Sequence, residues 1–162
     1  MFNLVCMGNN ITIKSGDLFT SNRQTIVNTI NCVGAMGKGI ALEFKKRYPD
    51  MYERYRVLCK NNLITIGKLW IYKTDSKWIL NFPTKDHWRY PSRIEYLEAG
   101  LKKFVSTYEE KGITSIAFPL LGTLNGGLDK KVVLDLMCSY LGGISIPVDI
   151  YDQSLVMSSY EI

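Results

Sequence analysis

Two glycine-rich segments, each directly after a run of β-branched and apolar residues, constrain the fold of this chain more than any other feature. Residues 34–39 follow the run 25–31, and residues 119–127 follow the run 113–118. Such runs are typical of buried strands. Because ligands of parallel α/β sheets bind beyond the carboxyl ends of the strands, both segments are expected at that edge.

Helical patterns alternate with the strand-like runs. Asp50 with Glu53, and Ser92 with Glu95, have the spacing of a capping box and are expected to open two of the helices. The predicted helices cover residues 40–48, about 50–60, 94–108 and, after the N-cap candidate Asp129, up to about 141. Further strands are predicted at residues 68–74 and 77–82, as a hairpin, and at 144–151. This alternation predicts one α/β domain over residues 1–162, with a mostly parallel sheet and helices on both faces.

Composition narrows the classes of partner. The 162 residues are 46% hydrophobic and carry a formal charge of +5, which favours an anionic partner such as a nucleotide or nucleic acid. A single histidine, His87, disfavours a histidine-based metal site, and no metal is expected.

The cysteines and the absence of a long apolar run bear on where the protein works. Cys6, Cys32, Cys59 and Cys138 are too scattered for a CxxC pair and are expected as buried free thiols in a reducing compartment. No apolar run approaches the ~20 residues of a membrane span, and the N-terminal residues lack a secretory pattern, so a cytoplasmic protein is expected.

The glycine-rich segments suit phosphate binding. Gly34, Gly37 and Gly39 lie between a strand and a helix, where glycine lets the backbone approach a ligand and the helix start offers unpaired N–H groups. The spacing is neither GxGxxG nor a P-loop, which disfavours ATPase chemistry of that class. A tight turn without ligand is the alternative for one such loop, whereas two loops at one sheet edge favour a phosphate site.

Three motifs in order resemble the macrodomain family over nearly the whole chain. They are Gly16-Asp-Leu18, Asn28-Thr-Ile-Asn31 leading into Gly34-Ala-Met-Gly-Lys-Gly39, and Pro119-Leu-Leu-Gly122-Thr-Leu-Asn-Gly-Gly127. Asn81-Phe-Pro-Thr-Lys-Asp-His-Trp-Arg89 is more specific and is similar to the DarG branch, whose members are antitoxins that remove ADP-ribose from thymidine bases of DNA. The resemblance implies a three-layer α/β/α macrodomain with a mixed, mostly parallel sheet, and ADP-ribose as ligand without any cofactor.

The resemblance also assigns the ADP-ribose contacts. It implies that Asp17 accepts a hydrogen bond from the adenine amino group and that Asn31 faces the distal ribose. A helix N-cap is the alternative for Asp17, and a buried, backbone-bonded amide is the alternative for Asn31. The full set of implied contacts is Asp17, Leu18, Thr29, Asn31, Val33, Met36, Gly37, Lys38, Gly39, Ile40, Thr84, Gly122, Thr123, Leu124, Asn125 and Gly126.

Lys85 is the implied catalytic residue. A free lysine titrates near ~10.4, so burial or a neighbouring cation must lower its pKa before the amine can attack or take a proton. Lys85 is expected to act either as the nucleophile on C1″ of the distal ribose or as the base that opens its ring; a surface lysine is the alternative. Related terminal ADP-ribose glycohydrolases pair their lysine with an aspartate in the second loop, but here that loop has Asn125 and no carboxylate.

Two further features bear on the substrate. His87, Trp88, Arg89 and Arg93 combine aromatic and basic side chains, which suits contacts to DNA that is expected to be single-stranded; a loop covering the sheet end is the alternative. Leu124 stands where the family's second loop has glycine, and its Cβ disfavours positive φ, so a reshaped loop is expected. The resemblance implies a monomer without membrane contact, a cognate ADP-ribosyltransferase toxin as possible partner, and either a standalone protein or a fragment.

The alternatives to a DNA ADP-ribosyl glycohydrolase come from other classes. One is a non-catalytic ADP-ribose-binding module, and the other is a macrodomain hydrolase acting on ADP-ribose-1″-phosphate or on protein-linked ADP-ribose.

Overall fold

A six-stranded sheet forms the centre of the computed structural model, which describes residue 6 and residues 8–153. The strands lie in the order β1 (Ile11–Ser15), β6 (Val148–Asp152), β5 (Ile116–Pro119), β2 (Thr25–Asn31), β4 (Trp78–Lys85) and β3 (Trp70–Lys73). Neighbouring strands are parallel except β3 and β4, which form the predicted antiparallel hairpin. The predicted mixed, mostly parallel sheet is therefore confirmed, whereas β1 is missing from the sequence-based prediction, although its alternating apolar and polar residues are typical of a half-buried strand.

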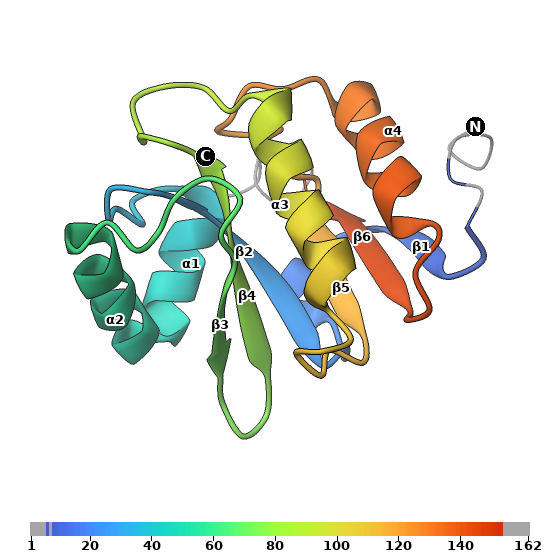
Figure 1. Cartoon of the computed structure of the whole chain (residues 1–162), viewed down its shortest axis with the longest axis horizontal. Helices are drawn as coiled ribbons and strands as arrows, with labels where there is room; N and C mark the ends of the chain where they lie inside the picture. Colours follow the sequence, from blue (N-terminus) through green and yellow to red (C-terminus); the bar gives the residue numbers. More distant parts are fainter. Residues whose placement is uncertain (1–5, 7, 154–162) are drawn as a thin grey trace.

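Helices cover both faces of the sheet and give a three-layer α/β/α architecture (Figure 1). One face carries α1 (Gly39–Arg47), α2 (Pro49–Lys60) and the short 3-10 helix η2 (Leu18–Thr20), and the other carries α3 (Ile94–Thr107) and α4 (Lys130–Leu141). Strand alternation separates the two cores, because Ile26 and Ile30 of β2 pack with α1 and α2 while Val27 packs with α3 and α4.

The N-cap predictions succeed once and fail twice. Asp129 accepts a hydrogen bond from a backbone N–H in the first turn of α4 at 3.1 Å, as predicted. The Asp50 prediction is wrong because α2 begins at Pro49, and proline at the first helical position has no N–H that needs a partner. The Ser92 prediction is also wrong: Arg93 is the N-cap of α3 and makes no side-chain cap, while the Ser92 N–H donates to the carbonyl of the second glycine-rich loop.

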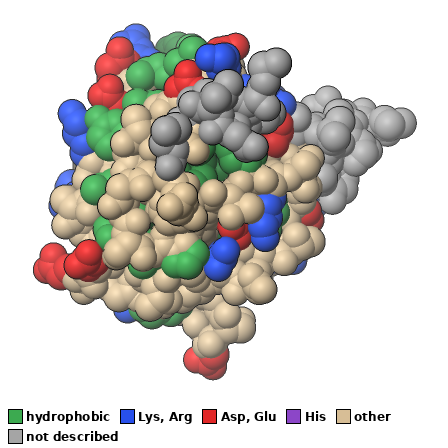
Figure 2. Space-filling model, turned by 90° about the vertical axis from the view of Figure 1, so that its right-hand side faces the viewer, with side chains coloured by type: hydrophobic (Ala, Val, Ile, Leu, Met, Phe, Trp, Pro, Cys, Tyr) green, Lys and Arg blue, Asp and Glu red, His purple; other side chains and the backbone are tan. Residues whose placement is uncertain are grey.

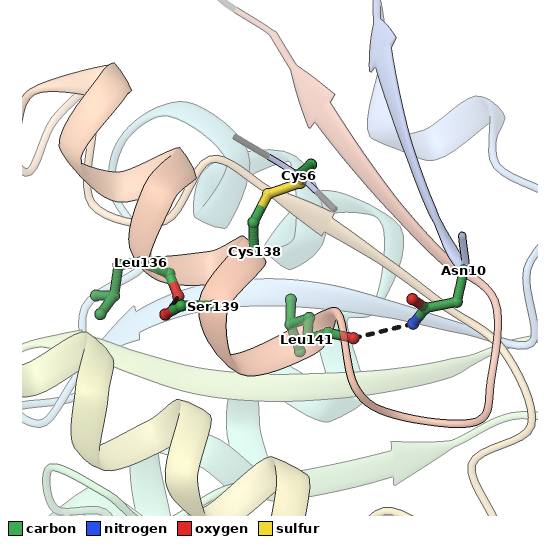
Figure 3. Close-up of a disulfide and its surroundings, with 6 residues drawn as sticks. All are labelled: Cys6, Asn10, Leu136, Cys138, Ser139 and Leu141. Carbon is green, nitrogen blue, oxygen red and sulfur yellow. Dashed lines mark hydrogen bonds between the residues drawn. A yellow bond between two sulfur atoms is a disulfide. The ribbon is translucent and has the colours of Figure 1, made fainter. Parts of the chain in front are cut away.

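A disulfide corrects the prediction that all four cysteines are free. Cys6 is bonded to Cys138 of α4, with Cα atoms 5.1 Å apart, and Figure 3 shows the bridge beside the hydrogen bond from Asn10 Nδ2 to the Leu141 carbonyl (2.9 Å). The two cysteines lie 132 residues apart in sequence, so no local spacing signals the pair. Cys32 and Cys59 are free thiols, as expected.

Within the described part of the chain, the helices lack the length and the hydrophobicity needed to cross a membrane.

Candidate functional site

A cavity of about 750 Å³ opens at the carboxyl edge of the sheet, where β2, β4, β5 and β6 end. Its walls are formed by residues at the ends of these strands and in the loops after them, drawn from the segments 35–41, 84–91, 119–127 and 151–153, though not every residue of each segment reaches the wall. Figure 1 shows the loop after β4 and the loop before α4 next to each other at that edge. The volume lies in the range of small-molecule binding sites.

Most of the residues singled out from the sequence meet in this cavity. Both glycine-rich segments contribute residues to its wall, and the end of β4 adds Lys85. The predicted residues in its walls are Thr29, Asn31, Gly37, Lys38, Gly39, Ile40, Thr84, Lys85, Trp88, Arg89, Gly122, Thr123, Leu124, Asn125 and Gly126.

Six other predicted residues lie outside the cavity wall, namely Asp17, Leu18, Val33, Met36, His87 and Arg93. The Asp17 carboxylate accepts a hydrogen bond from the backbone N–H of Phe19 at 2.9 Å and caps η2. The Leu18 N–H donates to Gln153 Oε1 at 2.6 Å, and Gln153 itself lines the cavity. The helix N-cap thus accounts for Asp17, and contact between this pair and an adenine stays a prediction.

Asn31 organises the first glycine-rich segment. Its Oδ1 accepts hydrogen bonds from the backbone N–H groups of Val33 (3.1 Å) and Ala35 (3.3 Å), and its Nδ2 donates to the Ala35 carbonyl at 2.8 Å. The buried Tyr55 hydroxyl lies 2.8 Å from Asn31 Oδ1 and 2.7 Å from the Asn31 carbonyl oxygen. This network fixes which way the amide points and leaves one N–H of Nδ2 for a group in the cavity.

The start of α1 supplies anion-binding groups to the same cavity. Lys38 is the N-cap and makes no side-chain cap, and the first turn contains no acidic residue. Gly39, with φ +57°, and Ile40 line the cavity. Unpaired backbone N–H groups and the positive end of the helix dipole make this position favourable for a phosphate.

The second glycine-rich segment is closely packed. A Cβ on Gly126 would lie 2.4 Å from the Gly122 carbonyl oxygen and 2.4 Å from Ser92 Oγ, so glycine is required there. Positive φ occurs at Gly122 (+69°) and Gly127 (+79°) and not at Leu124. The leucine, 47% exposed, therefore occupies its place in the loop without backbone strain.

A shift in strand register precedes Lys85. Ile30 of β2 pairs with Pro83, but Asn31 pairs with Lys85, so Thr84 is an extra residue in β4. Lys85 Nζ donates to the Trp88 carbonyl at 3.4 Å. Burial, and secondarily the positive charge of Lys38, lowers the pKa of Lys85 below its ordinary value. A larger fraction of neutral amine is therefore present at neutral pH than in a free lysine.

The segment after Lys85 places aromatic rings at the mouth of the cavity. Trp88 is 51% and Tyr90 61% exposed, and the Arg89 guanidinium lies 5.2 Å from the Trp88 ring centroid. His87 Nδ1 accepts a hydrogen bond from the Arg89 N–H at 3.0 Å, and its ring lies 5.1 Å from that of Trp88. The histidine thus contacts the loop itself, in keeping with a packing role.

Sequence reasoning missed several residues of the cavity wall. The β6 residues Tyr151 and Asp152, with Gln153, belong to it, and the Asp152 carboxylate forms an ion pair with Lys130 at 2.9 Å. They lie at the carboxyl end of the last parallel strand, which the predicted topology already places at this edge. The others are Ile30, Ala35, Ala41, Pro91, Pro119, Leu120 and Gly127, which are neighbours of predicted residues.

The chain resembles known proteins in sequence. Residues 27–137 match the model of the Macro domain family. The chain is 50% identical over 127 residues to a Mycobacterium tuberculosis protein named DNA ADP-ribosyl glycohydrolase. The aligned region covers 76% of this chain and 36% of the relative. The chain thus spans about a third of the length of that curated relative.

Solved structures agree with these matches. The macrodomain of Mycobacterium tuberculosis DarG superposes with a TM-score of 0.85 at 45% identity, covering 91% of this chain and 100% of that one. Thermosipho africanus DarTG in complex with ADP-ribose gives a TM-score of 0.85 at 39% identity, covering 90% of this chain and 42% of that one.

Proposed function

This chain belongs to the macrodomain family, and from that premise we propose that it is a DNA ADP-ribosyl glycohydrolase. The reaction is the hydrolysis of the bond between C1″ of ADP-ribose and a thymine base of DNA. Support comes from the name of the relative that is 50% identical over 127 residues, and from the cavity built by both glycine-rich segments.

We propose that ADP-ribose occupies this cavity with its diphosphate between the two segments. This placement is supported by the presence of both the first residues of α1 and residues 122–126 in the cavity wall. Backbone N–H groups can surround a diphosphate without a dedicated arginine. The distal ribose would then lie toward Asn31 and Lys85, which are paired residues on adjacent strands.

The observation that carries the proposal is a lysine of lowered pKa in the wall of this cavity. As a nucleophile, the neutral amine of Lys85 forms a bond to C1″ while the bond from C1″ to the thymine nitrogen breaks and thymine leaves with a proton; water then attacks C1″, breaks the bond to the lysine and supplies the hydroxyl of the released ADP-ribose. As a base, the amine takes a proton from the water that adds to C1″ while the bond from C1″ to the ring oxygen breaks and the ribose ring opens; thymine then leaves with a proton, and the resulting aldehyde closes to ADP-ribose. Holding the diphosphate fixes C1″ within reach of the amine, which is where most of the acceleration would arise.

The proposal is tested with an ADP-ribosylated single-stranded oligonucleotide. The protein is expected to release ADP-ribose, and Lys85→Ala is expected to lose turnover while calorimetry still detects ADP-ribose binding. Lys85→Arg, which keeps the positive charge but has no neutral form near neutral pH, is the matched control and is also expected to be inactive. Unchanged turnover in Lys85→Ala would contradict the assignment.

The same assay separates the alternatives. Binding of ADP-ribose by the wild-type protein without any release from the oligonucleotide would make it a binding module. Release from ADP-ribose-1″-phosphate or from ADP-ribosylated protein, but not from DNA, would place it among the other macrodomain hydrolases.

We further propose that the protein works in the cytoplasm, as a monomer, as the antitoxin to a DNA ADP-ribosyltransferase. A Thermosipho africanus relative, 38% identical over 161 residues, is named a fusion of a DNA ADP-ribosyl transferase with a DNA ADP-ribosyl glycohydrolase. Co-expression with such a transferase is expected to restore growth of the host, and Lys85→Ala is expected not to.

A further inference from the structure

The positive charge of this chain is concentrated in one segment. Residues 38–60 contain seven Lys or Arg and three Asp or Glu, and so provide four of the five net positive charges of the whole chain. By contrast, α3 on the opposite face of the sheet has two of each sign. The side of the molecule that carries β1 and α4 shows acidic and basic side chains interspersed (Figure 2). The field of the molecule is therefore asymmetric.

Within this segment, four side chains make up a surface that we name the basic strip: Lys45, Tyr52, Arg56 and Lys60. Tyr52, Arg56 and Lys60 follow one another at steps of four in α2 and so lie on one side of that helix. Lys45 Nζ of α1 lies 4.4 Å from the centroid of the Tyr52 ring, and the Arg56 guanidinium carbon lies 5.9 Å from it. The tyrosine is thus flanked by two cations from two helices.

The basic strip begins next to the cavity. A Cβ on Gly34 would lie 3.8 Å from the Arg56 Cα atom, so this part of α2 packs directly behind the first glycine-rich segment. Ala35, the next residue, lines the cavity. Arg56 is thus separated from the cavity wall by this loop segment alone, and a polymer that leaves the cavity across the segment would reach the basic strip.

Acidic side chains do little to neutralise the basic strip. Among the described residues, neither Lys45 nor Lys60 has a carboxylate within 4.0 Å. Arg56 pairs with Glu53 at 3.6 Å, but both side chains are more than half exposed, and such surface pairs are weak and exchange readily with solvent and other anions. The strip therefore retains positive charge for a partner.

We propose that the basic strip binds the sugar-phosphate backbone of the DNA strand whose ADP-ribose occupies the cavity. Cations spaced along the strip meet phosphates, and the Tyr52 ring holds the Lys45 and Arg56 cations at neighbouring positions. This inference rests on the proposed function for the identity of the polymer. It adds that DNA on the α1–α2 side of the cavity contributes to substrate affinity.

The test compares substrates that differ only in their DNA. One is ADP-ribosylated thymidine mononucleotide, which fills the cavity and cannot reach the strip, and the other is an ADP-ribosylated single-stranded oligonucleotide. The strip variant is Lys45→Gln/Arg56→Gln/Lys60→Gln. Its control, Lys102→Gln/Lys103→Gln/Lys111→Gln, loses the same charge from the α3 side of the molecule.

We expect the strip variant to raise KM for the oligonucleotide about tenfold at low salt, because several phosphate contacts are lost together. Turnover of the mononucleotide is expected to stay at the wild-type level, and the control is expected to behave as wild type with both substrates. Binding of an unmodified oligonucleotide gives a readout that needs no catalysis. The slope of log K against log salt should fall by about 2 in the strip variant, at about 0.7 for each phosphate contact removed.

The outcomes are distinct. Equal losses in the strip variant and the control would attribute the effect to net charge and overturn the proposal. A wild-type KM and a wild-type salt slope in the strip variant would also overturn it. If the wild-type protein binds polyglutamate and the strip variant loses only that binding, with DNA binding unchanged, the partner would be an acidic protein and the proposal would be overturned as well. Failure of the wild-type protein to release ADP-ribose from either substrate would defeat the proposed function instead, and the unmodified oligonucleotide would still test the strip.

Discussion

Two lysines line the same cavity, and the charge of one acts on the proton affinity of the other. Lys38 lowers the pKa of Lys85, in addition to the larger effect of burial. Replacing Lys38 by Gln removes a positive charge, so the pKa of Lys85 should rise toward its ordinary value. In the proposed mechanism the neutral amine is the reactive form, so the rise of kcat/KM with pH should move to higher pH in Lys38→Gln, and turnover at neutral pH should fall.

The pH–rate profile of release from the oligonucleotide checks this, with Lys102→Gln on α3 as the control for loss of a distant charge. A loss that is the same at every pH would mean that Lys38 contributes only to binding of the phosphates.

Tyr55 supports Asn31 and, through it, the first glycine-rich segment. Tyr55→Phe removes the hydroxyl that lies 2.8 Å from Asn31 Oδ1 but keeps the ring in its buried site. We expect the free energy of unfolding to fall by about 1–2 kcal/mol, the usual effect of losing a buried hydrogen bond. We also expect weaker ADP-ribose binding, because the amide of Asn31 is less firmly oriented.

Urea denaturation and calorimetry measure the two effects, and Tyr96→Phe in α3 is the control. An unchanged affinity for ADP-ribose together with the loss of stability would show that Tyr55 supports the fold alone.

Among single residues, the sequence predicted those that can be recognised from their amino-acid type and from the motif around them. Lys85 and both glycine-rich segments are in the cavity wall. It did not predict Tyr55 or Gln153, because no local motif distinguishes them from other tyrosines and glutamines. Their roles follow only from the folded structure, in which Tyr55 contacts Asn31 and Gln153 contacts Leu18.

The two glycine-rich elements need their glycines for different reasons. A Cβ on Gly126 would lie 2.4 Å from backbone and from Ser92, whereas a Cβ on Gly37 would meet no atom within 4 Å. Gly126→Ala is therefore expected to distort the second segment and to lower both stability and ADP-ribose affinity. Gly37→Ala is expected to fold with wild-type stability and to lose affinity only because a ligand approaches the backbone there.

Thermal unfolding with calorimetry on both variants separates the two effects. Wild-type ADP-ribose affinity in Gly37→Ala would mean that no ligand passes close to this segment.

Elements were predicted where the local signal agrees with the tertiary structure. The α3 and α4 helices and the β3–β4 hairpin follow from residue pattern, but the start of α2 and α3 did not follow from capping boxes. Pro49 can begin α2 without a side-chain cap. Ser92 does not cap α3, and its backbone N–H donates instead to the carbonyl of Gly126 in the second glycine-rich segment. In both cases a neighbouring feature overrides the local motif.

For the molecule as a whole, the disulfide joins the N-terminal segment to α4. It closes a sequence separation of 132 residues, and closing a loop of that length restricts the unfolded chain. Reduction is expected to lower the free energy of unfolding by about 2–4 kcal/mol, the typical contribution of such a bridge. Urea denaturation with and without a thiol reductant measures it.

Cys138→Ala is the matched control, because it should match the reduced protein and should not respond to reductant. Equal stability of the oxidised and reduced wild-type protein would contradict this prediction. Local reasoning from sequence could not find the bridge, since pairing over that distance follows only from the packing of residue 6 against α4.

Thr84, the residue of β4 that has no partner in β2, affects which changes of length this strand can tolerate in evolution. Side chains of a strand alternate between its faces, so the loss of Thr84 itself would turn the Lys85 amine toward the opposite layer relative to the residues before it. Length changes in the turns on either side of β4 would leave this relation as it is. The orientation of the amine that we propose to be reactive thus depends on one inserted residue.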